Sequence, residues 1–209
     1  MPPVSQVVMA VAFAIPCFTM AARLFRVWRD PMGVEDGRWV RIGTGVFVLE
    51  FVLLHAGILL GAAGAGADTL AGKVGATLGL TAFYGLFAGA VALGFQSRML
   101  FTSFLWMIGG RFVALAVGIS ERDTELLTAH SVVGMMIYFA MVLVSVVLPI
   151  PRLGITPQVA AATRQPNASG TWVDHPHRAI GAAAVYFLLL GVVELSVMTW
   201  IDPGTLMPN

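Results

Sequence analysis

The fold class is decided by one stretch of sequence, residues 42–64, which reads IGTGVFVLEFVLLHAGILLGAAG. Glu50 and His55 are the ionisable residues within it. A helix of about 20 apolar residues crosses the hydrocarbon core of a bilayer, which is about 30 Å thick. The stretch is long enough and apolar enough to do so, and it therefore predicts a membrane-spanning helix.

Further apolar runs of comparable length lie on both sides of this stretch. They cover residues 7–24, 74–95, 100–119, 126–150 and 179–201. Over the 209 residues of the chain, 58% are hydrophobic and 11% are charged, whereas about 25% are charged in an ordinary soluble domain. We therefore expect an all-α fold, a polytopic integral membrane protein in which residues 1–209 form a single membrane domain built as a six-transmembrane-helix bundle.

Arginine placement predicts the side of the membrane on which each loop lies, because short cytoplasmic loops are enriched in basic residues. Most of the twelve basic residues fall on one side of the predicted spans: Arg23, Arg26, Arg29, Arg38, Arg41, Arg98, Arg152, Arg164 and Arg178. The long connection 151–178 belongs to this side, which we expect to be cytoplasmic. Both termini are then non-cytoplasmic, and the membrane is expected to be a bacterial-type inner (plasma) membrane. Trp28 and Trp39 are expected to act as interfacial anchors.

Several classes of function find no support in the sequence. The net charge of +1 is too balanced to favour a nucleic-acid partner. Cys17 is the single cysteine, which excludes an intrachain disulfide and a cysteine-rich metal site. The sequence also lacks a phosphate-binding glycine loop, a Gly-x-Ser-x-Gly turn and a His-Glu-x-x-His helix. We therefore do not expect the chain to be an enzyme by itself.

Ionisable residues inside the predicted spans give the strongest indication of a site, because a charged group at the centre of a span costs roughly 2.5–3.5 kcal/mol on insertion scales. They are Glu50, His55, Arg111, His130 and Glu194. Counted from the span ends at a rise of about 1.5 Å per residue, Glu50 lies near the midplane and the other four lie in the outer half. This pattern predicts a polar site in the outer half of the membrane.

Glu50 also lies on the same helix face as Gly57 and Gly61, which follow it by two and three turns. A carboxyl aligned with small residues is expected to face protein, since such residues let helices approach closely. Similar pairs spaced by four residues recur at Gly75 and Gly79 and at Gly85 and Gly89. They are predicted to be helix packing sites.

Four interpretations of the polar site are open. In the first, Arg111 forms a buried ion pair with Glu194 or Glu50. In the second, His55 and His130 are the axial ligands of a b-type haem, and Arg111 binds a propionate. In the third, the two histidines bind a transition-metal ion together with Glu194 or Glu50. In the fourth, Glu50 and His55 relay protons across the membrane.

A second group of potential metal ligands lies in the sequence Asp174-His175-Pro176-His177, before the last predicted span. Carboxylate and imidazole groups are metal ligands, but Pro176 limits how far these side chains can converge. Solvation at the membrane interface is the preferred interpretation of this segment, and a metal cluster is the alternative.

Together these observations predict a non-enzymatic integral membrane component with a polar site that holds a haem or a metal ion. Its small size and the lack of a soluble domain suit a subunit of a larger membrane complex or an oligomer. The expected partners are the lipid bilayer and other membrane subunits or further copies of the chain. The alternative is a small proton-coupled transporter or channel that uses Glu50 and His55.

Overall fold

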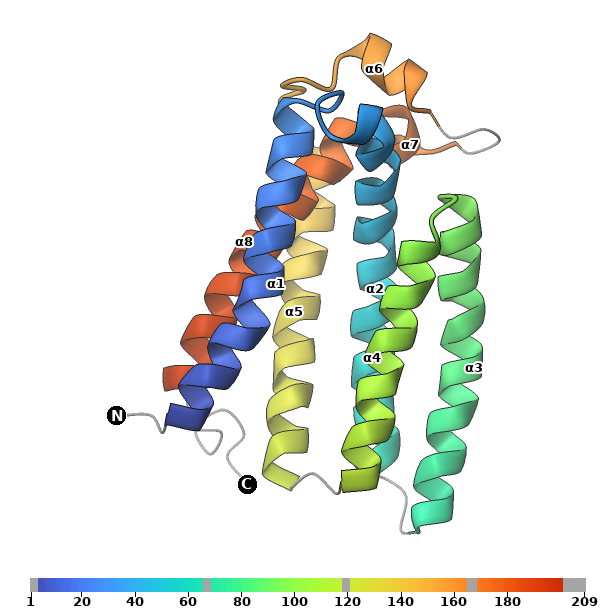
Figure 1. Cartoon of the computed structure of the whole chain (residues 1–209), viewed down its shortest axis with the longest axis vertical. Coiled ribbons are helices and arrows are strands. Elements are labelled where there is room, and N and C mark those ends of the chain that lie inside the picture. The colour runs from blue at the N-terminus through green and yellow to red at the C-terminus, as the bar shows by residue number, and fades with distance from the viewer. Residues whose placement is uncertain (1–3, 66–68, 118–120, 165–168, 201–209) are drawn as a thin grey trace. The chain divides into compact units, whose positions relative to one another are not determined.

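A computed structural model of the chain describes the backbone of residues 4–65, 69–117, 121–164 and 169–200 (Figure 1). It describes the side chains of residues 10–60, 62, 69, 71–109, 131–164 and 169–196. The long elements are all α-helices: α1 (Val4–Arg29), α2 (Arg38–Ala65), α3 (Leu70–Gly94), α4 (Arg98–Val117), α5 (Glu121–Val147) and α8 (Pro176–Trp200). Three short helical elements complete the fold: η1 (Glu35–Gly37), α6 (Pro157–Ala162) and α7 (Thr171–Asp174).

The prediction of an all-helical fold is confirmed for the described residues, which include helices that are long and apolar enough to span a membrane. Four segments are long and apolar enough to cross a membrane, namely Ala10–Arg29, Glu35–Leu60, Ala71–Gly94 and Pro176–Ser196. A shorter apolar helical segment, Ser131–Val147, belongs to α5. A long apolar helix suits a bilayer because its backbone groups are all hydrogen-bonded within the segment.

The chain forms two compact units, which we describe separately. The first unit comprises Met1–Thr44 and Ile137–Asn209, and the second comprises Gly45–Met136. The boundaries between the units fall inside α2 and α5.

In the first unit, α1 packs along α8 (Figure 1). Residues 179–184 of α8 are all buried. A Cβ atom at Gly191 would lie 2.8 Å from the ring of Phe18, and one at Gly181 would lie 3.0 Å from the ring of Trp28. Small residues on α8 therefore let the two helices come closer than larger side chains would allow, which is how helices gain dispersion contacts in the absence of a hydrophobic driving force.

The connection between α5 and α8 is more ordered than a surface loop, because it is bonded to the end of α1. The indole Nε1 of Trp28 donates to the carbonyl of Pro151 at 2.8 Å, and the amide of Gly154 donates to the carbonyl of Trp28 at 3.0 Å. A Cβ at Gly154 would overlap the carbonyl oxygen of Arg29. Glycine is thus required where this segment crosses α1.

The same connection and the start of α8 are both bonded to the carboxyl end of α5. Arg178 Nη1 donates to the carbonyl of Val146 at 3.0 Å, and Trp172 Nε1 donates to Ser145 Oγ at 3.0 Å. The Ser145 hydroxyl is fully buried and donates in turn to the carbonyl of Val142 at 2.7 Å. A cation that bonds the last carbonyls of a helix satisfies acceptors that have no partner within the helix.

In the second unit, α3 and α4 form a hairpin whose turn contains Gln96 at a φ of 50°. A Cβ at Gly85 would lie 3.6 Å from the ring of Phe104 in α4, an ordinary contact distance. At Gly75 and Gly79 it would meet no atom of the described residues within 4 Å. The predicted packing site at Gly75 and Gly79 is therefore not used within the described part of the chain.

We expect Gly154→Ala to destabilise the first unit by about 1–3 kcal/mol, the usual cost of overpacking, because its Cβ would collide with the main chain of Arg29. The measurement is thermal unfolding of the purified protein in detergent. The control is Gly79→Ala, which makes the same chemical change in open space and should be neutral or slightly stabilising. Equal stability of Gly154→Ala and the wild type would contradict the close approach.

Candidate functional site

The residues of the predicted polar site are divided between the two units. Glu50 and His55 lie in the second unit and Glu194 in the first. Arg111 and His130 belong to α4 and α5, but they fall outside the residues whose side chains are described. The ion pair and the two-histidine site therefore stay predictions, and the site is built here from His55 outward.

His55 forms a hydrogen bond between helices α2 and α3. Its Nδ1 lies 2.8 Å from the hydroxyl of Tyr84. The His55 ring also stacks on Phe51 with 5.5 Å between the ring centroids and 13° between the planes. Tyr84 meets the same ring edge-on at 85°. His55 is half-buried and Tyr84 is 4% exposed, so the imidazole is held in one orientation by a bond on one side and a ring on another.

The hydrogen bond determines what the imidazole can do. A neutral imidazole has one nitrogen that donates and one that accepts. When Nδ1 carries the proton it donates to Tyr84, and Nε2 then presents a lone pair. When Tyr84 donates to Nδ1, Nε2 carries the proton. The pair can therefore present either a metal-ligating nitrogen or a donor, depending on the tautomer.

Sequence reasoning missed Tyr84, although the sequence contains a signal for it. Thr77, Thr81 and Tyr84 follow one another at spacings of four and three residues, which places them on one face of a helix. Thr77 is buried and donates to the carbonyl of Lys73 at 2.8 Å. The buried Thr81 hydroxyl has no hydrogen-bond partner among the described residues. Hydroxyl groups at helical spacing inside an apolar run indicate a face that packs on protein rather than lipid.

The two carboxylates of the predicted site lie in different surroundings. Glu50 is half-buried, and Gly57 on the same face of α2 is buried. Glu194 is buried within the first unit. Both carboxyls make interactions within the protein, as expected for acidic groups in apolar segments.

The structure does not support a metal cluster in the segment Asp174-His175-Pro176-His177. Among the described residues, which include this segment, no group of three or more His, Cys, Asp or Glu side chains converges on a metal position. Asp174 is instead paired with Arg164 at 2.8 Å and accepts from the amide of Gly170 at 3.3 Å. The metal alternative for this segment therefore finds no support in the described residues.

We expect the bond between His55 and Tyr84 to appear as a coupling energy in a double-mutant cycle. His55→Leu, Tyr84→Phe and the double variant are compared with the wild type by thermal or denaturant unfolding in detergent. The expected coupling is about 0.6 kcal/mol, the average measured for hydrogen bonds between membrane helices, and at most about 1.7 kcal/mol.

Ser103→Ala in place of His55→Leu supplies the control for this cycle. The Ser103 hydroxyl donates to the carbonyl of Met99 in its own helix, so its coupling to Tyr84 should be close to zero. A coupling near zero in the His55 cycle as well would contradict the interhelical bond.

Comparison with known proteins adds no information about the site. No protein-family model matches the chain, and the searches of curated proteins and of solved structures each found no match.

Proposed function

We propose that the chain is a non-enzymatic integral membrane component that assembles with other membrane subunits or with further copies of itself, and that it holds a b-type haem or a transition-metal ion at His55. The observation that carries the proposal is the 2.8 Å hydrogen bond between His55 Nδ1 and the Tyr84 hydroxyl. It fixes the imidazole, and when Nδ1 is the donor it leaves Nε2 as the coordinating atom.

The bond supports a ligand role because histidines that bind metals almost always donate their other ring N–H to a neighbouring acceptor. The Tyr84 hydroxyl is such an acceptor, and Phe51 covers one face of the ring. For a haem, the second axial ligand in this proposal is His130, and Arg111 binds a propionate. For a non-haem metal, His130 and the carboxylate of Glu50 complete the site.

We also propose six membrane spans, corresponding to the six long helices, with both termini on the non-cytoplasmic face of a bacterial-type inner membrane. In the first unit, α6 and α7 lie beside the carboxyl end of α1 and the amino end of α8 (Figure 1). Arginines near this end are Arg23, Arg26, Arg29, Arg38, Arg41, Arg152, Arg164 and Arg178. Such a concentration of basic residues supports a cytoplasmic position for this end.

Exposed apolar side chains in the second unit support a membrane environment for it. Trp106 is 87% exposed and Leu93 is 81% exposed. Large apolar side chains exposed in this way contact lipid or another membrane subunit in the membrane. Lipid and another membrane subunit are both partners in this proposal.

The protein is purified from its native membrane for the test. If it holds a haem, we expect its absorption spectrum to show a Soret band that shifts on reduction with dithionite. If it holds a non-haem metal, we expect a stoichiometric metal content. His55→Ala should abolish either signal because it removes the ligand. Tyr84→Phe should weaken metal binding by roughly 10- to 100-fold, the usual effect of losing such a partner. His175→Ala, a histidine exposed outside this site, is the matched control and should keep the signal.

A colourless, metal-free wild-type sample would reject the cofactor. Purification of the chain as a lone monomer without other subunits, under conditions that preserve membrane complexes, would reject the assembly. The two parts of the proposal therefore fail separately.

The same hydrogen bond also favours one alternative, a proton-coupled transporter or channel. An imidazole can take up and release a proton, and a bonded hydroxyl can pass a proton to it. In this alternative Glu50 is the second relay group, one and a half turns before His55 on α2.

Under this alternative, we expect Glu50→Gln to abolish proton flux in proteoliposomes while leaving folding intact, because an amide cannot carry the proton. Asp36→Asn is the control, since it makes the same carboxyl-to-amide change at an exposed position in η1 and should leave flux unchanged. Flux that persists in Glu50→Gln would exclude Glu50 as the relay.

A further inference from the structure

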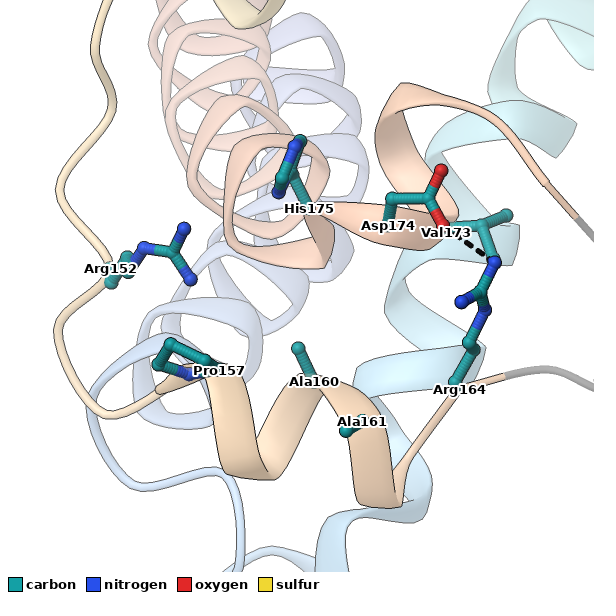
Figure 2. Close-up of a pocket in the computed structure, with 8 residues that line it drawn as sticks. All are labelled: Arg152, Pro157, Ala160, Ala161, Arg164, Val173, Asp174 and His175. Atoms are coloured by element: carbon teal, nitrogen blue, oxygen red, sulfur yellow. Dashed lines mark ion pairs between the residues drawn. The ribbon is translucent and has the colours of Figure 1, made fainter.

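A pocket of about 310 Å³ lies in the first unit, in the connection between α5 and α8. This volume is at the lower end of the range for small-molecule sites. Its lining is formed by Arg152, Pro157, Ala160, Ala161, Arg164, Val173, Asp174 and His175. The lining residues come from the segment before α6, from α6 itself and the residues just after it, and from α7 with the residue that follows it. Figure 2 shows α6 as one wall, with Arg152 and His175 on other sides.

The lining carries one uncompensated positive charge. Arg164 and Asp174 neutralise each other through their 2.8 Å ion pair at one edge. The side chain of Arg152 has no hydrogen-bond or ion-pair partner in the described part of the chain. Its guanidinium is directed toward the space between α6 and His175 (Figure 2). A planar guanidinium with unused donors is suited to a two-pronged contact with an oxyanion.

A further arginine, Arg178, adds positive potential behind this lining, next to the buried His177. The ring of His177 lies 5.9 Å from the ring of His175, and His177 is 5% exposed. Its buried Nδ1 has no hydrogen-bond partner within the residues described. Arg152 and Arg178 both interact electrostatically with His177. The surroundings of the pocket are therefore cationic, with Asp174 as the acidic group of its lining and already paired.

Part of the lining is apolar, and the pocket lies near the start of a candidate membrane span. Pro157, Ala160 and Val173 contribute no charge to the lining. The span begins at Pro176, directly after His175. A pocket with a cationic side and an apolar wall at this position suits an anionic group attached to an organic body.

We propose that this pocket binds a phosphate group, with Arg152 and His175 as the residues that contact its oxygens. The phosphate is carried either by an anionic lipid headgroup or by a soluble phosphate compound, since both offer the same oxygens to the guanidinium. The site does not depend on a cofactor at His55, because its residues all lie in the first unit.

The test measures binding by thermal shift on the purified whole chain at constant ionic strength. One probe is inorganic phosphate in a neutral detergent. The other is phosphatidic acid in phosphatidylcholine nanodiscs, compared with phosphatidylcholine alone. We expect at least one probe to stabilise the wild type. A response to inorganic phosphate identifies a soluble ligand, and a response confined to phosphatidic acid identifies a lipid headgroup; both support the site.

Arg152→Gln should weaken binding of the active probe by about tenfold or more, because it removes a charge-assisted hydrogen bond. Arg152 is exposed, so the variant is expected to fold. The matched control is Arg26→Gln, an exposed arginine of α1 that does not line the pocket, and it should bind like the wild type. No response to either probe, or equal responses in the two variants, would overturn the proposal.

A second pair of variants tests charge without removing Arg152. Ala161 is exposed in the wall formed by α6. Ala161→Glu places a carboxylate in the pocket, whereas Ala161→Gln adds a side chain of the same shape without the charge. Binding should be lost in Ala161→Glu and better retained in Ala161→Gln. Equal binding by both variants would count against recognition of an anion.

Discussion

The first unit depends on the close approach of α1 and α8. Trp28 lies at this contact and is also bonded to the connection between α5 and α8. The ring of Trp28 packs where Gly181 has no side chain. Its indole donates to Pro151, and its carbonyl accepts from Gly154. One residue thus fixes helix spacing and the start of the connection together. Because Arg152 lies between these two bonded positions, the cationic side of the pocket is also positioned by α1.

Polar side chains inside the apolar helices are satisfied in two different ways. The hydroxyls of Thr44, Thr77 and Ser103 donate to carbonyls one turn earlier in their own helices. These bonds need no neighbouring helix and say little about a site. The bond between His55 and Tyr84 instead joins two helices, so it fixes their relative rotation and gives a titratable group a defined direction.

The parts of the fold that could be predicted from the sequence are those that local interactions determine. Apolar length and helical hydrogen bonding are local, so the runs 42–64 and 179–201 correspond closely to α2 and α8. The order in the connection 151–178 could not be predicted, because it depends on Gly154 meeting α1. His55 was identifiable as a polar residue in an apolar run. Tyr84 could not be identified as its partner, since their contact joins two different helices, α2 and α3.

The bond between Trp28 and Pro151 joins residues that are 123 positions apart in the chain. At a synthesis rate of about 5–20 residues per second, roughly 6–25 s separate the emergence of its two partners from the ribosome. During that interval α1 lacks the helix against which it packs, while the hairpin of α3 and α4 joins segments that are neighbours in the chain. The two units therefore differ in the time at which they can assemble. The hairpin can form during synthesis, whereas α1 lacks its packing partner until α8 has been made.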